Sequence, residues 1–387
     1  MPPIALNRRR FLGCSAASLA LTQGPAAQAA AAGSAVGPIR VGLIGVGGRG
    51  TTLLRTLLEL PGVVVPVVCD PESRHRARGE GVVEKASGRR PESVADPARV
   101  LERGDVDAIV VAVPCDLHER ISTEAIKANK HLYAEKPLAI TVEGCDRLIA
   151  ESGRATGVVV HVGFQRRSNP RFQEGVALIR SGGLGPLIEA RASWTSSNGP
   201  LTGHDGWLGS RRRSGDFMVE QAVHIWDVLN WIHGSPPVSA SGWGRRGLFA
   251  RQDPGRDVTD HYGVELAWAD GFRASFVQSY IAPADENFTG SHLRVLGVDG
   301  GFDFGSGALT YRDRDRPRRA IQPGARNDTR LAIEAFLAAV RSDGPTPPPV
   351  TLQEARAATL TGLLVRKAVD EGRLVTIDET AGHTPVS

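Results

Sequence analysis

Apolar runs and amphipathic stretches alternate between the amino-terminal segment and residue 164. Unbroken apolar runs at 39–44, 63–69 and 107–114, with shorter ones at 131–135 and 157–164, are typical of strands buried on both faces. Stretches with helical periodicity separate them, over 51–60, 71–86, 116–129 and 142–156. Strict alternation of such strands and helices predicts a doubly wound parallel sheet, with its ligand beyond the carboxyl ends of the strands.

The pattern changes in the second half of the chain. Successive short strands are predicted at 186–196, 237–247, 259–268, 272–280, 291–298 and 301–304, and Asp270-Gly271 is a hairpin signal. A run of strands after a βα alternation predicts a separate, mostly antiparallel domain. We therefore expect a Rossmann domain over 38–163, an α+β domain over 164–350, and a helix and strand over 351–380 that pack back toward the first domain.

A predicted helix over 219–233 carries titratable residues at helical spacing. At about 100° per residue, Glu220, His224, Asp227 and Trp231 fall within roughly 60° of one another. Apolar residues occupy the opposite side, namely Met218, Ala222, Ile225, Leu229 and Ile232. The pattern predicts one buried face and one exposed titratable face, which suits a metal site, an acid–base pair or an ordinary solvated surface.

The amino-terminal segment has the order of an export signal. Arg8, Arg9 and Arg10 precede Phe11-Leu12, a weakly apolar Ala-rich run and a small-residue cleavage site at 27–29. The paired arginines indicate the twin-arginine route, which carries folded proteins, and predict a signal peptide over 1–30 and a periplasmic or otherwise exported location. The run is too short and too rich in small residues for a permanent membrane span, which needs about 20 apolar residues.

Charge and cysteine content exclude several classes of protein. The chain has 46 basic and 42 acidic residues, and removal of the predicted signal with its three arginines leaves it nearly neutral. No basic stripe typical of nucleic-acid binding is present. The cysteines outside the signal, Cys69, Cys115 and Cys145, lack the spacing of a disulfide framework or a zinc site.

The first predicted strand leads into G-x-G-x-x-G, formed by Gly45, Gly47 and Gly50, and then into a helix. This context predicts a dinucleotide site, in which glycines allow the pyrophosphate to approach the helix amino terminus. Asp70 ends the second strand, where a carboxylate accepts hydrogen bonds from the ribose hydroxyls and favours NAD. Arg49 and Arg74 lie close in sequence and leave NADP as an alternative. The predicted cofactor-binding residues are Gly45, Gly47, Gly48, Arg49, Gly50, Asp70, Pro114, His118, Glu135 and Gln165.

The chain resembles the Gfo/Idh/MocA family, the relatives of glucose–fructose oxidoreductase and inositol dehydrogenase. The resemblance covers essentially all of 38–380 and is carried by the segments GLIGVGGRG, VAVPCDLH, EKP, GFQRR and VEQAVHIWDVLNWI. It implies a carboxyl-terminal domain with a large open sheet that holds the substrate and often the oligomer interface. It also implies that Lys136 lies near the nicotinamide and that His224 accepts a proton. Glu220 stands where aspartate is usual, and Pro114 and His118 match the family's strand-end residues.

Elementary chemistry gives these side chains coherent roles. Oxidation of a secondary alcohol removes the hydroxyl proton as hydride leaves the carbon, and neutral histidine is a suitable acceptor. A lysine ammonium stabilises the developing alkoxide, and a carboxylate one turn from the histidine can orient the substrate or tune the imidazole. Two roles are possible for Asp227: it is a catalytic group, or it is a structural partner of the helix, for example of His224. No second histidine lies at ligand spacing, so no metal is predicted.

Export limits the choice of catalytic cycle, because free NAD is not expected to be maintained outside the cytoplasmic membrane. We therefore expect a tightly bound cofactor that is regenerated in place. The leading hypothesis is a sugar or polyol oxidoreductase; the alternatives are a redox-neutral, NAD-dependent glycosidase or lyase and a non-catalytic sugar-binding protein. Ring faces pack on sugar C–H surfaces, so Trp194, Trp207, Tyr262 and Tyr280 are candidates for a sugar site or for the core.

Overall fold

The fold is taken from a computed structural model, which describes residues 37–201, 205–321, 327–342 and 346–380. The predicted export signal lies outside these residues. Six parallel strands form the first sheet in the order β3-β2-β1-β4-β5-β6. They are β1 (Ile39–Ile44), β2 (Val63–Cys69), β3 (Glu92–Val94), β4 (Ala108–Val111), β5 (His131–Ala134) and β6 (Val160–Val162). The doubly wound parallel sheet is therefore confirmed, with β3 as a strand that the sequence analysis did not predict.

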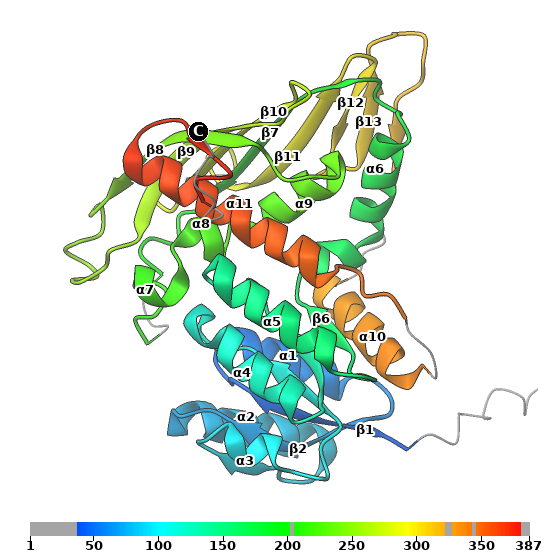
Figure 1. The fold of residues 1–387 in the computed structure, drawn as a ribbon, viewed down its shortest axis with the longest axis vertical. Helices are drawn as coiled ribbons and strands as arrows, with labels where there is room; N and C mark the ends of the chain where they lie inside the picture. Colours follow the sequence, from blue (N-terminus) through cyan, green and yellow to red (C-terminus); the bar gives the residue numbers. More distant parts are fainter. Residues whose placement is uncertain (1–36, 202–204, 322–326, 343–345, 381–387) are drawn as a thin grey trace, which may run out of the picture. The chain divides into compact units, whose positions relative to one another are not determined.

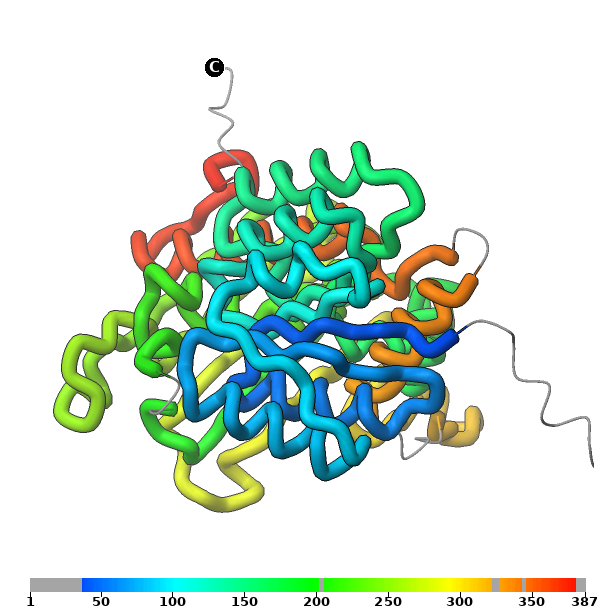
Figure 2. The backbone as a smooth tube through the Cα atoms, turned by 90° about the horizontal axis from the view of Figure 1, so that it is seen from below, coloured from blue at the N-terminus to red at the C-terminus, as the bar shows by residue number. Residues whose placement is uncertain are grey.

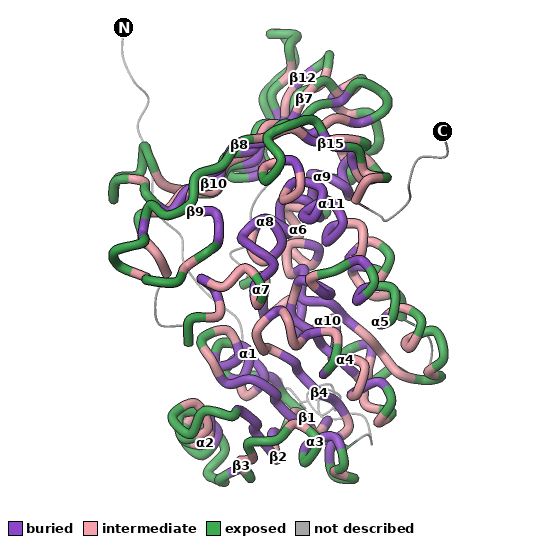
Figure 3. The backbone as a smooth tube through the Cα atoms, turned by 60° about the vertical axis from the view of Figure 1, so that its left-hand side comes forward, coloured by how far each residue is buried: buried purple, intermediate pink, exposed green. Residues whose placement is uncertain are grey.

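Helices cover this sheet because their apolar stripes match its two apolar faces. They are α1 (Gly48–Leu58), α2 (Ser73–Ser87), α3 (Ala98–Leu101), α4 (His118–Lys127) and α5 (Val142–Arg154). Val41 and Leu43 of β1 and Leu53 and Leu57 of α1 are fully buried in one continuous core. Burial of an aliphatic side chain stabilises the fold by about 1.5–3 kcal/mol. Figure 3 shows the buried strands between the more exposed outer turns of the helices.

The second sheet has nine described strands in the order β14-β13-β12-β11-β7-β10-β9-β8-β15. Neighbouring strands are antiparallel except β7 and β10, which are parallel. The strands are β7 (Leu187–Thr195), β8 (Ser239–Arg246), β9 (Thr259–Ala267), β10 (Arg273–Ser279), β11 (Gly290–Gly297), β12 (Gly300–Asp303), β13 (Ala308–Tyr311), β14 (Arg319–Ala320) and β15 (Val375–Thr376). The predicted α+β domain with a mostly antiparallel sheet is confirmed.

One face of the second sheet is covered by helices (Figure 1). These are α6 (Pro170–Arg180), α9 (Val223–His233) and α11 (Leu352–Glu371), and the short helices α7 (Arg211–Ser214) and α8 (Phe217–Glu220) precede α9. Tyr262 and Phe276 point to the covered face and are buried, whereas Glu265 and Val277 point outward and are exposed. Helix α11 begins with a capping box formed by Thr351 and Glu354 and packs on α9, β8 and α5.

Helix α10 (Asp328–Arg341) belongs to the core of the first sheet although it follows the second sheet in sequence. Its Ile333 and Phe336 are fully buried, and the Phe336 ring lies 5.8 Å from that of Tyr133 on β5. Arg341 at its end donates to the carbonyl oxygens of Pro61 and Gly62 at 3.0 and 3.1 Å. Figure 2 shows this orange segment beside the blue amino-terminal elements.

The expected single helix over 219–233, with one exposed face, is wrong in two respects. The chain forms α8 and α9 with a break at Gln221 and Ala222. There the Glu220 carbonyl oxygen accepts from Lys136, and the Gln221 side chain joins a partly buried network with Gln278 and Tyr280. Both sides of α9 are buried, with Trp226 fully buried and His224 and Asp227 6% and 1% exposed. The titratable residues therefore lie inside the protein.

Within the described ranges, no helix combines the length and the apolar character needed to cross a membrane.

Candidate active site

The glycine-rich loop between β1 and α1 forms an open cradle at the carboxyl end of the first strand. Gly45 has a φ of +92°, and a Cβ there would meet the Ala112 carbonyl oxygen at 2.2 Å. A Cβ on Gly47 or Gly48 would meet no atom within 4 Å. Helix α1 begins at Gly48 without a side-chain cap, so its first N–H groups face this open space. The cradle fits the pyrophosphate of a dinucleotide.

Asp70 holds the cradle against the end of β2. It is 6% exposed, and its carboxylate accepts hydrogen bonds from the Val46 and Glu72 amides at 2.8 and 2.9 Å. His75 Nδ1 lies 3.3 Å from the same carboxylate. Contact with a ribose hydroxyl stays a prediction. Arg74, one of the two residues for which NADP was considered, forms an exposed ion pair with Asp205.

Arg49 lies in the same loop but its guanidinium is engaged by other elements. Nε donates to Glu135 Oε1 at 2.8 Å, and Nη1 donates to Thr329 Oγ1 of α10 at 2.9 Å. Glu135 is 4% exposed. Burial opposes the charge of Arg49, yet Glu135 keeps the pKa of the guanidinium above its ordinary value. These two predicted cofactor-binding residues thus tie the glycine-rich loop to β5 and α10.

Lys136 and Glu220 form an ion pair between the two domains. Lys136 follows β5, and its Nζ donates to Glu220 Oε1 at 2.7 Å and to the Glu220 carbonyl oxygen at 2.5 Å. Their side chains are 12% and 14% exposed. Burial disfavours the ammonium, but the adjacent Glu220 carboxylate outweighs burial and raises the pKa of Lys136. Lys136 is therefore a fixed cation at the end of the strand.

His118 supports the segment that carries Lys136. The His118 side chain is buried, with Nδ1 2.6 Å from the Pro137 carbonyl oxygen and Nε2 2.9 Å from that of Val113. It connects the segment after β4 to Pro137, which follows Lys136 through a cis peptide bond. Burial lowers the pKa of His118. Pro114 lies beside it at the start of a 3-10 turn, and direct contact of either residue with a cofactor stays a prediction.

Asp216 positions Glu220 and was missed by the sequence analysis. It is fully buried at the start of α8 with a φ of +75°. Its Oδ1 accepts from the Phe217 amide at 2.7 Å, and Oδ2 accepts from Thr259 Oγ1 of β9 at 3.0 Å. Asp at a helix start is a recognised capping signal, although its pairing with Thr259 depends on the tertiary fold.

His224 lies in the first turn of α9 between two aromatic rings. The Phe164 and Trp194 ring centroids are 6.1 and 6.3 Å from its own. Nδ1 is buried and has no hydrogen-bond partner among the described residues. Burial, followed by the positive charges of Lys136, Arg166 and Arg49, lowers the pKa of His224 well below its ordinary value. The imidazole is therefore neutral at physiological pH and close to Lys136.

Asp227 is paired with Arg167 and not with His224. Arg167 Nε lies 3.1 and 3.0 Å from the two Asp227 oxygens, and Nη2 lies 2.8 Å from Oδ1. Arg167 Nη1 also donates to Glu354 of α11 at 3.0 Å, and the guanidinium lies 4.5 Å from the Trp231 ring centroid. This triad, in which Asp227 and Arg167 are buried and Glu354 is partly exposed, joins the GFQRR segment to α9 and α11, and it favours a structural role for Asp227.

The residues before Arg167 face the region around His224. Gln165 begins a 3-10 turn after β6, and its Oε1 is buried without a partner in the described part of the chain. Such an orphaned acceptor fits a ligand that supplies a donor. Arg166 lies 5.5 Å from the centroids of both the Phe172 and Trp194 rings. Trp194 is thus shared by Arg166 and His224.

The other aromatic candidates are placed differently. Tyr262 and Tyr280 are buried and hydrogen bonded to Gln278, and Tyr280 also donates to Gln221. Trp207 packs on a small cluster that includes Phe217 and Phe249. Of the four, Trp194 is the one whose ring contacts His224.

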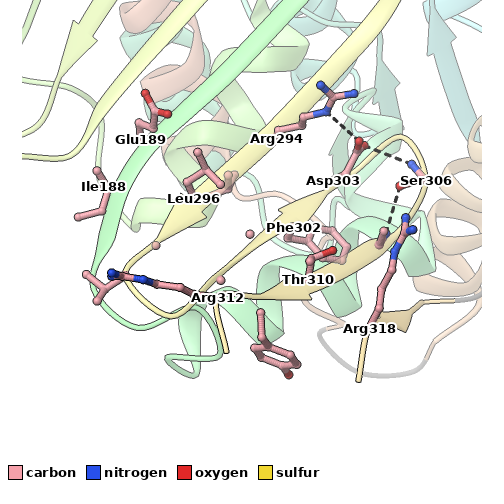
Figure 4. A pocket seen from close by; sticks show the side chains of 17 residues that line it. Ile188, Glu189, Arg294, Leu296, Phe302, Asp303, Ser306, Thr310, Arg312 and Arg318 are labelled. Carbon is pink, nitrogen blue, oxygen red and sulfur yellow. Dashed lines mark hydrogen bonds and ion pairs between the residues drawn. The ribbon is translucent and has the colours of Figure 1, made fainter. Parts of the chain in front are cut away.

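A hollow of about 600 Å³ lies on the second sheet, lined by β7, β11, β12 and β13. Figure 4 shows Ile188, Glu189, Arg294 and Leu296 along its side. Its lining includes none of the predicted site residues. The described residues contain no group of three His, Cys, Asp or Glu side chains arranged to hold a metal ion.

The fold and this arrangement define an oxidoreductase with a nicotinamide-nucleotide fold followed by a sheet domain. Two family models match consecutive parts of the chain, "Oxidoreductase family, NAD-binding Rossmann fold" over 39–164 and "GFO/IDH/MocA C-terminal domain" over 172–303, together two thirds of its length. The chain belongs to the GFO/IDH/MocA family, as the resemblance predicted.

Individual relatives are inositol dehydrogenases. The chain is 30% identical to inositol 2-dehydrogenase 2 of Saccharopolyspora erythraea over 56% of this chain and 60% of that one. It is 26% identical to myo-inositol 2-dehydrogenase of Thermotoga maritima over 89% of this chain and all of that one. Apart from the latter, the chain spans little more than half the length of the curated relatives it matches. The structure of scyllo-inositol dehydrogenase from Lactobacillus casei with NAD(H) and scyllo-inositol shares the fold, with a TM-score of 0.71, 16% identity and coverage of 88% and 99%.

Proposed function

We propose that this protein oxidises a secondary hydroxyl of a sugar or polyol, with NAD as the hydride acceptor. The observation that carries the proposal is the meeting of a charged Lys136–Glu220 pair with a neutral, buried His224. Lys136 follows β5 of the nucleotide fold, and Glu220 and His224 belong to the successive helices α8 and α9. The names of the relatives, inositol 2-dehydrogenases, support a polyol or sugar as the substrate class.

Three side chains have different roles in this reaction. His224 accepts the proton of the substrate hydroxyl, since its imidazole is neutral. Lys136 stabilises the negative charge that develops on the same oxygen, and Glu220 holds Lys136 in place at 2.7 Å. The cradle at Gly47 and the amide end of α1 would hold the cofactor, which supplies hydride chemistry when bound. NADP is the second choice.

Turnover with purified protein tests this proposal. Protein mixed with NAD and a panel of polyols and sugars should change the nicotinamide absorbance. Lys136→Ala and His224→Ala should each lower turnover by about 100-fold or more while the cofactor still binds. The matched control is His292→Ala on the exposed part of β11, which should retain full turnover. Near-normal turnover in either site variant would refute the assignment.

Tight cofactor binding and export belong to the same proposal. The predicted twin-arginine signal over 1–30 requires export of a folded protein, together with a cofactor that does not need to exchange. Expression of the full chain with and without Arg8→Lys/Arg9→Lys, followed by fractionation, tests the periplasmic location. Mass spectrometry of the purified protein for co-purifying NAD or NADP tests retention, and its absence after mild purification would contradict tight binding.

A redox-neutral cycle is the alternative use of the same groups. In that cycle the substrate is oxidised, undergoes elimination or epimerisation, and is reduced again by the same cofactor. Aryl glycosides would then be cleaved without net change in nicotinamide absorbance. A non-catalytic sugar-binding protein would show neither reaction, and His224→Ala would leave its sugar affinity unchanged.

We further propose that a second copy of the chain packs on the second sheet. The hollow beside β11 exposes Ile188, Leu296 and Val298, with 52%, 39% and 41% of their surfaces accessible. Exposed apolar patches of this kind are typical of self-association surfaces. Leu296→Asp should lower the molar mass measured by light scattering, whereas Val64→Asp, at an apolar site on β2 that is 41% exposed, should not. An unchanged mass in Leu296→Asp would refute this interface.

A further inference from the structure

Four cations surround the candidate site, and three of them have a carboxylate partner. Lys136 pairs with Glu220, Arg49 with Glu135, and Arg167 with Asp227 and Glu354. Arg166 differs from these. Within the described residues, no carboxylate lies at ion-pair distance from its guanidinium, and its hydrogen bonding is limited to a 3.5 Å contact between Nη2 and Ser291 Oγ.

The Arg166 side chain is partly exposed and lies against two aromatic rings. Its guanidinium is placed between the rings of Phe172 and Trp194, 5.5 Å from each centroid. Partial desolvation by the surrounding protein lowers the pKa of Arg166 to about 10, and the acids Asp328 and Asp227 act on it only through space. Arginine has five N–H donors in a planar fork, and because the Arg166 side chain is partly exposed, its free donors are accessible to a ligand. The neighbouring Arg167 shows how fully this fold can satisfy a guanidinium.

The position of Arg166 connects it to the reacting group. Trp194 lies 6.3 Å from the His224 ring and 5.5 Å from the Arg166 guanidinium, so both side chains lie next to the same indole. Arg166 is also close enough to lower the pKa of His224. A sugar ring stacked on Trp194 with one hydroxyl at His224 would present another substituent to Arg166.

We propose that Arg166 binds a carboxylate of the substrate, so that the preferred substrates are sugar acids such as uronic or aldonic acids. This inference rests on the proposed function and narrows its substrate class. The guanidinium fork matches a carboxylate in bidentate geometry. The carboxylate supplies the negative charge that the protein itself does not place beside Arg166, and a neutral polyol leaves that charge uncompensated.

Matched pairs of substrates test the proposal. Each acid is compared with its neutral counterpart: D-glucuronate with D-glucose, D-galacturonate with D-galactose, and D-gluconate with sorbitol. Binding to the protein with NADH is followed by tryptophan fluorescence, and turnover with NAD by nicotinamide absorbance. The wild type should favour the acid of at least one pair by about 10- to 100-fold in kcat/KM and in affinity.

Three variants locate the effect. Arg166→Gln should abolish the preference for the acid, Arg166→Lys should keep part of it because the charge remains without the fork, and both should bind NADH normally. The control Arg191→Gln lies on the same strand as Trp194, but its side chain is 69% exposed and paired with Glu189 at 2.5 Å. It should keep the full preference.

The outcomes separate this inference from the proposed function. Turnover of neutral sugars with no preference for acids in the wild type would overturn the role of Arg166 and leave the oxidoreductase intact. Binding of acids that depends on Arg166 without any turnover would support the carboxylate site and refute the oxidoreductase. A preference for sugar phosphates over uronates would overturn the proposal. So would a loss of NADH binding in Arg166→Gln as large as its loss of acid binding.

Discussion

Substitution of Asp227 by asparagine separates a structural role from a catalytic one. The side chains of Asp227 and Arg167 are 1% and 3% exposed, and the carboxylate accepts three N–H contacts between 2.8 and 3.1 Å. The amide keeps the shape but loses the charge and all but one acceptor. Arg167 is then left with Glu354, whose side chain is 42% exposed. Removing one partner of a buried pair costs about 3–5 kcal/mol, which is a large part of a typical free energy of unfolding of about 5–15 kcal/mol.

Urea unfolding followed by tryptophan fluorescence measures this loss, because Trp226 and Trp231 lie on the same helix. The control Glu354→Gln removes the more exposed partner and should cost at most about 1 kcal/mol. Turnover of folded Asp227→Asn should fall less than about tenfold, below the range expected for an acid–base group. A loss of stability under about 1 kcal/mol, or full stability with turnover reduced as in His224→Ala, would refute the structural role.

Further expectations concern the glycine cradle and the imidazole. Gly47→Val should weaken NAD binding by at least about tenfold with little change in stability, because a Cβ at Gly47 meets only open space; Gly50→Val should unfold the domain, since a Cβ there lies 1.9 Å from the Gly45 carbonyl oxygen. Calorimetry measures the stability of both variants and NAD titration measures their affinity. The same loss of stability and of affinity in Gly47→Val and Gly50→Val would contradict this contrast. The neutral form of His224 persists below the ordinary histidine pKa because its pKa is lowered by burial, so the acid limb of kcat/KM should lie below about pH 6.5. An acid limb at or above that value would show that another group controls activity.

The layout of the first domain could be predicted because its strands are continuous apolar runs that end in recognisable residues. Gly45, Gly47 and Gly50 mark the cradle through backbone geometry, which is a local property. Strand β3 escaped detection because Glu92–Val94 is three residues long and partly exposed. Strands β7 to β12 of the second sheet were also predicted to within a few residues, since alternation is visible in the sequence, whereas the short strands β13 and β14 were not predicted.

The arrangement of the candidate site depends on contacts that periodicity cannot show. A helical pattern continues through Gln221, but the helix is interrupted there, and the Gln221 side chain contacts Gln278 and Tyr280, 57 and 59 residues away. The same holds for Asp227 and Arg167, which are 60 residues apart. The pairing of Lys136 with Glu220 spans 84 residues. The residue types could be predicted, but their partners are set by the tertiary fold.

The location of α10 in the core of the first sheet has a consequence for synthesis. Phe336 and Ile333 fill a space between α1 and β5 that the first 163 residues leave unfilled. A ribosome adds about 5–20 residues per second, so roughly 8 to 35 seconds separate the end of β6 from the synthesis of α10. During that interval the nucleotide domain has an open apolar surface. The export of a folded chain that we propose would therefore have to wait until nearly all of the chain has been translated.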